Sequence, residues 1–133
     1  MEQKLHLLII IAFLSFSLFS AVNAIDGLAV YYDPDYYSPA PACGYPRSTG
    51  VFVAGVRDNL WDGGRACGRT YRVRCTGGIG QAPYPCKPGW VTVKVIDYCR
   101  SVCNGDINLS RDAFNKIADP KAGKIHIDYQ RIS

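Results

Sequence analysis

The residues best suited to chemistry gather in one short stretch of the sequence, residues 95–110 (VIDYCRSVCNGDINLS). It contains Asp97, Asp106 and Asn108, and two cysteines that lie four positions apart. Pairs of carboxyl groups serve acid–base hydrolysis, in which one group donates a proton and the other stays ionised. Two cysteines this close can instead form a disulfide that closes a loop. The stretch is therefore either an active site or a stapled loop.

The amino-acid composition excludes several other kinds of catalytic or metal site. After residue 24 the sequence contains no glutamate, and its only histidine is His126. This excludes a Glu proton donor, a zinc site built from several histidines and most Ser-His-Asp arrangements. His126 alternates with Ile125 and Ile127, so we expect it on the solvent face of a strand. We expect neither a metal nor a cofactor.

Residues 1–24 predict a cleaved secretory signal peptide. Lys4 precedes a continuous apolar run over residues 7–19, and residues 22–24 (VNA) have the small-residue pattern of a cleavage site. The run is shorter than the roughly 20 residues that span a bilayer, so we do not expect stable membrane insertion. We expect residues 25–133 to form one secreted, monomeric domain.

All six cysteines lie after this segment. An even number in a secreted chain favours three disulfides over a metal site, although the spacing leaves many pairings open. The net charge of +4 comes from scattered basic residues, so nucleic-acid binding is not expected. The same mild charge suits an acidic polysaccharide or an anionic membrane surface as well as it suits ordinary solubility.

Short β-rich segments alternate with turn-rich ones along residues 25–133. Ser110 is well placed to cap a helix that ends at Ala118, and four prolines between residues 33 and 50 predict a long loop. Strands are predicted over 27–32, 51–56, 70–75, 90–97 and 124–132. Roughly five or six strands and one short helix predict a small all-β barrel or sandwich.

Several fragments, taken in order, resemble the first domain of expansins. They are AVYY (29–32), ACGY (42–45), ACG (66–68), YRVRC (71–75), VKVIDYC (93–99), and Leu109-Ser110 followed by Ala113-Phe114 and Ile117-Ala118. The resemblance covers nearly all of residues 25–133 and is to the single-domain members, the plant natriuretic peptide-like proteins. It implies a six-stranded double-psi β-barrel with disulfides Cys43–Cys67, Cys75–Cys86 and Cys99–Cys103.

The resemblance also implies which residues line a groove. Related glucanases have a proton-donating aspartate where this sequence has Asn108, and an amide cannot act as that acid. Asp106 lies two residues earlier, about 6–7 Å away on an extended strand, which is too far for the same reaction geometry. Asp97 matches a groove aspartate of bacterial expansin-like proteins. The alternative is that Asp97 accepts backbone N–H groups from the loop between Cys99 and Cys103.

Related glucanases carry their second carboxylate in a Thr-x-Tyr-x-Asp pattern on the first strand. If Tyr31 aligns with the tyrosine of this pattern, the carboxylate position falls on Asp33. If Tyr32 aligns with it, the position falls on Pro34. The sequence therefore predicts no catalytic residue, only a vestigial groove formed by Asp97, Asn108 and Asp33. Asn108-Leu109-Ser110 is also an N-glycosylation sequon, and a glycan there would block the groove.

The resemblance implies a non-catalytic signalling protein of the apoplast that regulates water and ion homeostasis and stress or defence responses through a cell-surface receptor. The alternative is a non-hydrolytic protein of expansin type that binds or loosens cell-wall polysaccharide. Aromatic side chains and arginines dominate interface energetics, and they supply most of the expected contacts. The candidates for receptor or glycan contact are Tyr32, Tyr36, Tyr37, Tyr45, Arg57, Trp61, Arg65 and Asp97.

Overall fold

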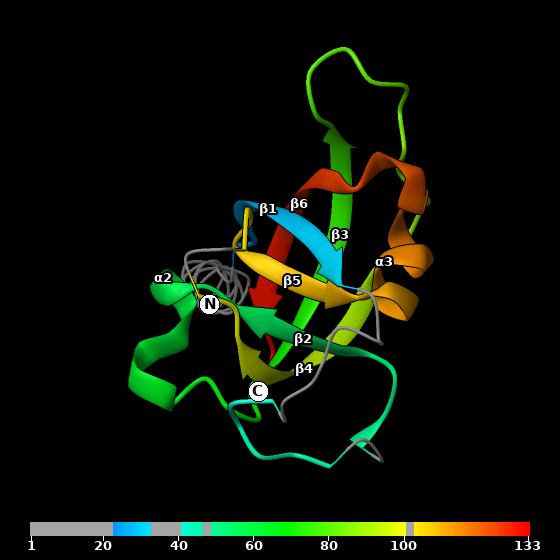
Figure 1. The fold of residues 1–133 in the computed structure, drawn as a ribbon. Coiled ribbons are helices and arrows are strands. Elements are labelled where there is room, and N and C mark those ends of the chain that lie inside the picture. The colour runs from blue at the N-terminus through cyan, green and yellow to red at the C-terminus, as the bar shows by residue number, and fades with distance from the viewer. Residues whose placement is uncertain (1–22, 33–40, 47–48, 101–102) are drawn as a thin grey trace, which may run out of the picture.

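Six short strands close into a barrel in the computed structural model, which describes residues 23–32, 41–46, 49–100 and 103–133 (Figure 1). Around the barrel the order is β1-β5-β2-β4-β3-β6, and β6 pairs again with β1. The pairs β1–β5 and β2–β4 are parallel and the other four are antiparallel. The strands are β1 (Ile25–Tyr32), β2 (Val53–Val56), β3 (Thr70–Gly78), β4 (Val91–Tyr98), β5 (Ile107–Ser110) and β6 (Lys124–Arg131). The expected six-stranded double-psi β-barrel is confirmed.

Alternating side chains fill the barrel, as the sequence pattern predicts. Val73, Val93 and Ile127 lie on three neighbouring strands and are almost completely buried. His126, which lies between two buried isoleucines of β6, is exposed as expected. Branched apolar residues at every second position suit a pleated surface with one buried face.

One strand and one helix were not predicted. Strand β5 is only four residues long, and its apolar residues are too few to show an alternating pattern. The segment after β2 contains the four-residue helix α2 (Asp58–Trp61) and the 3₁₀ turn η3 (Asp62–Gly64). The fold therefore has two short α-helices, and the prediction of one was wrong.

The predicted helix is α3 (Arg111–Ile117), and Ser110 caps it by accepting a hydrogen bond from the Ala113 N–H at 3.3 Å. Its buried face presents Phe114 and Ile117 to β1, β4 and β5. A second 3₁₀ turn, η4 (Pro120–Ala122), leads into β6. The three disulfides join Cys43 to Cys67, Cys75 to Cys86 and Cys99 to Cys103, which are the pairings that the resemblance implies.

Candidate functional site

Asp97 lies at the barrel surface because strand β4 is irregular near its end. The alternate valines of β4 are buried, so strict alternation would turn Asp97 inward as well. The pairing with β2 shifts between Ala54 and Gly55, so that Asp97, and not Ile96, becomes the partner of Gly55. A β-bulge of this kind re-aims the side chains that follow it. Asp97 is consequently half-buried at the surface of the barrel.

Asn108 lies in line with Asp97 across the sheet. It pairs with Val30 of β1 on one side and with Gly55 of β2 on the other, and Gly55 in turn pairs with Asp97. Neighbouring strands are ~4.8 Å apart, so the Cα atoms of Asn108 and Asp97 are separated by roughly 10 Å. We call the three residues Asn108, Gly55 and Asp97 the polar row.

Gly55 lets its neighbours approach the middle of the polar row. A Cβ atom at this position would lie 3.4 Å from the Cβ of Cys99 and 3.6 Å from the Cβ of Asp97. Cys99 therefore packs against β2 at this point, and it donates its N–H to the Val56 carbonyl at 2.8 Å. The Cys99–Cys103 disulfide thus borders the polar row at Cys99.

Asp97 accepts a backbone hydrogen bond from a segment outside the Cys99–Cys103 loop. Its Oδ1 accepts a hydrogen bond from the Ala42 N–H at 2.8 Å. The neighbouring Cys43 donates its N–H to the Ile96 carbonyl at 3.1 Å, which ties the segment 41–46 to the end of β4. Residues 101 and 102 of the Cys99–Cys103 loop lie outside the described residues, so a hydrogen bond from that loop to Asp97 stays a prediction. The second carboxylate oxygen of Asp97 accepts no hydrogen bond from the described residues.

Asp106 does not share the polar row with Asn108. Its Oδ2 accepts the Leu28 N–H at 2.8 Å, and its Oδ1 accepts from the Asn59 side chain at 3.1 Å. The carboxylate therefore joins the start of β5 to β1 and to α2. Burial raises the pKa of the nearby Tyr129 phenol, and the negative charge of Asp106 raises it further.

The polar row supplies the groups for hydrogen bonding, and it holds one carboxylate only. An ionised Asp97 accepts hydrogen bonds, whereas the Asn108 amide both donates and accepts them. Inverting hydrolysis needs two carboxyl groups about 6.5–9.5 Å apart, and retaining hydrolysis needs them closer. The row can therefore bind a hydroxyl-rich chain, but its own residues do not form an acid pair.

Two of the aromatic candidates make internal contacts at the edge of this surface. Trp61 stacks on Tyr98, with ring centroids 4.8 Å apart and 21° between the ring planes, and packs against the core. The Lys94 ammonium lies 4.2 Å from the centroid of the Tyr45 ring. A Cβ at Gly68 would come within 2.7 Å of the Tyr45 hydroxyl, so the glycine makes room for this ring. Both rings are only partly exposed.

The two candidate arginines lie near α2 and are both exposed. The side chain of Arg65 is 80% exposed although it contacts Asp62 at 3.2 Å. Arg69 donates to the same carboxylate at 2.6 Å, and this guanidinium holds the pKa of Asp62 below its usual value, with Arg65 lowering it further. Arg57 precedes α2 and donates its N–H to the Asp106 carbonyl.

Tyr32 pairs with Ser110 and is half-buried, two residues further along the β1–β5 ladder than Asn108. Its neighbour Tyr31 points into the fold, where its ring packs on Phe114 and its hydroxyl donates to the Pro120 carbonyl. Three other candidates, Asp33, Tyr36 and Tyr37, lie outside the described residues. The register of Asp33 therefore stays open.

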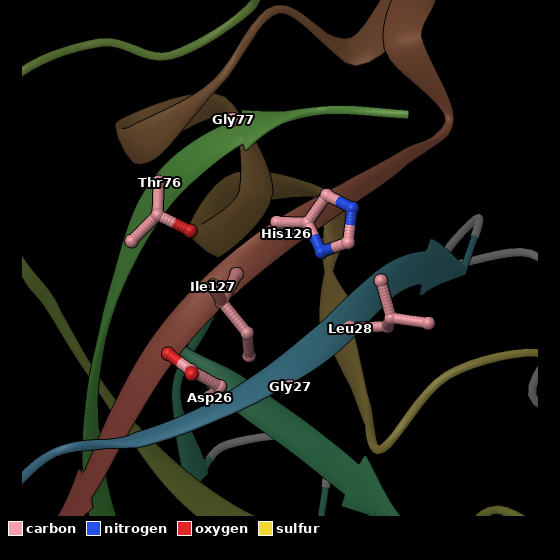
Figure 2. Close-up of a pocket in the computed structure, with 7 residues that line it drawn as sticks. All are labelled: Asp26, Gly27, Leu28, Thr76, Gly77, His126 and Ile127. Atoms are coloured by element: carbon pink, nitrogen blue, oxygen red, sulfur yellow. The ribbon is translucent and has the colours of Figure 1, made fainter. Parts of the chain in front are cut away.

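Sequence reasoning missed Gly55 and Ala42, whose roles depend on cross-strand register and on a loop contact. It also missed a pocket on the outer face of β1, β3 and β6, which Figure 2 shows. The sequon serine, Ser110, is buried and donates to the Val51 carbonyl at 2.5 Å, so its hydroxyl belongs to the fold. Modification at Asn108 stays a prediction.

Neither a metal site nor a spanning helix occurs in the part of the chain that the structure describes. No group of three or more His, Cys, Asp or Glu side chains there is arranged to hold a metal ion. Within the same residues no helix is both long enough and apolar enough to cross a bilayer.

Comparisons with known proteins give relatives in both sequence and structure. The family model DPBB_1, described as lytic transglycolase, matches residues 53–129. EG45-like domain containing protein 2 of Arabidopsis thaliana is 51% identical over 110 residues, which cover 83% of this chain and 82% of that protein. An EG45-like domain containing protein of Citrus jambhiri is 41% identical over 113 residues, 84% of this chain and 85% of that protein.

A solved structure gives a similar fold. A mutant form of Clavibacter michiganensis expansin, in complex with cellohexaose, superposes with a TM-score of 0.62 and 26% identity. The match covers 84% of this chain and 51% of that chain.

Proposed function

Since the chain belongs to the family of EG45-like domain containing proteins, relatives of the expansins with a double-psi β-barrel, we propose that it binds a cell-wall β-glucan without hydrolysing it. The polar row is the observation that carries this proposal. It sets one carboxylate and one amide on the same outer face, with a glycine between them. Carboxylate and amide groups are suited to the hydroxyls of a sugar chain.

Two features support binding without cleavage. Asn108 stands where the resemblance expects the proton donor, and Asp106 has both carboxylate oxygens engaged by Leu28 and Asn59. A general acid must lie within hydrogen-bond reach of the leaving oxygen, and the polar row has no second carboxylate to do so. The expansin that resembles this fold was crystallised with cellohexaose, which supports a β-1,4-glucan as the ligand class.

Retention on insoluble cellulose tests the proposal, with release of reducing ends measured in the same samples. Asp97→Asn removes the charge but keeps an oxygen that can accept the Ala42 N–H, so the segment 41–46 should stay in place. We expect this variant to bind about 10-fold more weakly, because hydrogen bonds to a charged group are worth roughly 1.5–3 kcal/mol.

The matched control is Asp112→Asn, the same change at an exposed aspartate in the first turn of α3. It should bind like the wild type. Equal binding by all three proteins, or reducing ends released by the wild type, would each contradict the proposal.

Signalling at the cell surface is the second candidate, and the exposure of Arg65 favours it. Arg57 and Arg65 flank α2 and η3, and arginine is enriched among the residues that dominate protein interfaces. A receptor-dependent signal predicts that wall-free plant protoplasts swell in response to the disulfide-intact protein. Swelling that survives Asp97→Asn but is lost in a double Arg57→Ala, Arg65→Ala variant would favour this function. Absence of swelling would leave glycan binding as the function.

Secretion to the apoplast is part of the proposal. Lys4 and the apolar run over residues 7–19 support a signal peptide that is removed after Ala24. Amino-terminal sequencing of protein collected from the medium of expressing plant cells should begin at Ile25. Retention of the full chain inside the cells would contradict it.

A further inference from the structure

A pocket lies on the opposite side of the barrel from the polar row. Strands β5 and β2 carry most of the polar row, and in the closed order they lie across from β3 and β6. The pocket, shown in Figure 2, is formed by the outer face of β3, β6 and the start of β1. Its volume is about 440 Å³, which falls within the roughly 300–1,000 Å³ of small-molecule sites.

A second strand irregularity creates this pocket. The pairing of β3 with β6 shifts between Cys75 and Gly77, which leaves Thr76 as the extra residue of a bulge. A Cβ atom placed on Gly77 would meet no atom within 4 Å. The glycine therefore leaves the pocket open at the point where any other residue would place a side chain. Bulges of this kind occur preferentially next to functional sites.

Three different hydrogen-bonding groups border the pocket, each from a different strand. They are the Asp26 carboxylate of β1, the Thr76 hydroxyl of β3 and the His126 imidazole of β6 (Figure 2). Within the described residues, neither Thr76 nor His126 makes a side-chain hydrogen bond. Leu28 contributes an apolar edge beside them. The pocket thus combines a carboxylate and two polar groups that make no side-chain hydrogen bond within the described residues with an apolar wall.

The charges around the pocket favour a neutral ligand. Asp26 pairs across the ladder with Asp128, whose charge is neutralised by Arg74 at 2.9 Å. Arg74 does not neutralise the Asp26 carboxylate, and the negative charge of this group disfavours anions such as polyuronates. A metal ion is disfavoured as well, because the described residues hold no group of side chains arranged to ligate one. A sugar hydroxyl can donate to the carboxylate, and it can exchange hydrogen bonds with a hydroxyl or an imidazole.

We propose that this pocket binds a sugar ring of a neutral β-glucan, so that one barrel holds two glycan chains on opposite faces. The proposal rests on the proposed function, because it takes the same ligand class to a second site. Two sites on one rigid barrel give a bound protein a high effective concentration for a second chain. The protein then bridges neighbouring chains of a polysaccharide matrix.

Backbone-amide NMR of the disulfide-intact protein, titrated with cellohexaose, tests each face separately. We expect shifts at Thr76, Gly77 and His126 that are independent of the shifts at Gly55 and Asn108. Thr76→Ala should weaken binding at the pocket by about 3- to 10-fold, the value of one neutral hydrogen bond. Gly77→Val should abolish it by filling the open space, since valine suits an extended strand.

The matched control is Thr92→Ala, the same substitution at an exposed position of β4 outside the pocket. It should leave the shifts at both faces unchanged. The dispersion of each spectrum reports whether the variant is folded, and a folded Gly77→Val protein should retain the shifts of the polar row.

The outcomes separate the two proposals. Shifts confined to the polar row would overturn the second site and leave the proposed function standing. Shifts confined to the pocket would support the second site and overturn the role of the polar row. No shift at either face would overturn both, and pocket shifts that persist in Gly77→Val would overturn the assignment of the sugar to this pocket.

Discussion

The Oδ2 atom of Asp106 accepts the backbone N–H of Leu28 at 2.8 Å, although 78 residues separate the two. The same carboxylate holds the Asn59 side chain with its other oxygen, and the Asp106 N–H donates to the Leu28 carbonyl. Asp106 therefore ties the start of β5 to β1 and cannot turn toward the polar row without breaking these bonds. This relationship determines what the aspartates of the chemistry-rich stretch can do.

Replacing Asp106 should destabilise the barrel. Asp106→Ala leaves the Leu28 N–H without its acceptor, which costs about 1–3 kcal/mol in the free energy of unfolding. Asp106→Asn should cost less, because the amide oxygen can still accept from Leu28. Denaturant unfolding measures both, with Asp58→Ala at an exposed position as a control that should change stability by less than about 0.5 kcal/mol. An Asp106→Ala protein as stable as the control would show that these bonds contribute little.

Restoring a carboxyl group at Asn108 should not restore hydrolysis. Asn108→Asp would place two aspartates at the ends of the polar row, but Asp97 is engaged by the Ala42 N–H, and Asp106 is held by Leu28 and Asn59. We expect no release of reducing ends from soluble β-glucan above that of the wild type. Measurable turnover by this variant would mean that the rest of an active site is present. The wild type would then lack activity only because position 108 holds asparagine instead of an acid.

The three disulfides should contribute to stability in the order of the loops they close. The bonded cysteines are 24, 11 and 4 residues apart for Cys43–Cys67, Cys75–Cys86 and Cys99–Cys103. Loop-closure entropy then predicts losses of ~3.5, ~2.8 and ~2.1 kcal/mol when each pair is replaced by alanine. Unfolding of the three double variants tests the ranking. A larger loss for the shortest loop would indicate that packing of Cys99 against Gly55 outweighs chain entropy.

Acid should remove the stabilisation that Asp128 provides. The Arg74 guanidinium holds the pKa of the Asp128 carboxyl below its usual value of 3.8. A group whose pKa is lower in the folded state stabilises the fold above its unfolded pKa, and this contribution is lost as the pH falls through the folded pKa.

The difference in unfolding free energy between the wild type and Asp128→Asn should therefore be constant from neutral pH down to about pH 5. It should shrink below about pH 4, as Asp128 becomes protonated in both states. Thermal unfolding between these conditions measures it, with Asp58→Asn as a control. A difference that stays the same in acid would show that the Asp128 charge makes no contribution.

The sequence by itself determined the parts of this protein that depend on local pattern. Alternating apolar residues predicted most of the strands, Ser110 predicted the start of α3, and the even number of cysteines predicted three disulfides. Strand β5 and helix α2 were not predicted, because a four-residue segment has too short a sequence pattern to distinguish it from a turn. The disulfide pairing followed from family resemblance, since the spacing of the cysteines left many pairings open.

Only the tertiary structure decided which surroundings the polar side chains of Asp97, Thr76 and Asp106 meet. Asp97 faces outward because of a register shift against β2, and Thr76 borders a pocket because of another against β6. Asp106 is engaged by a strand that lies 78 residues earlier in the chain. Each outcome depends on which residues of distant strands become partners, and that register is set by closing the whole barrel. Local sequence patterns specify the faces of a strand, whereas the neighbours that a side chain meets are fixed by long-range pairing.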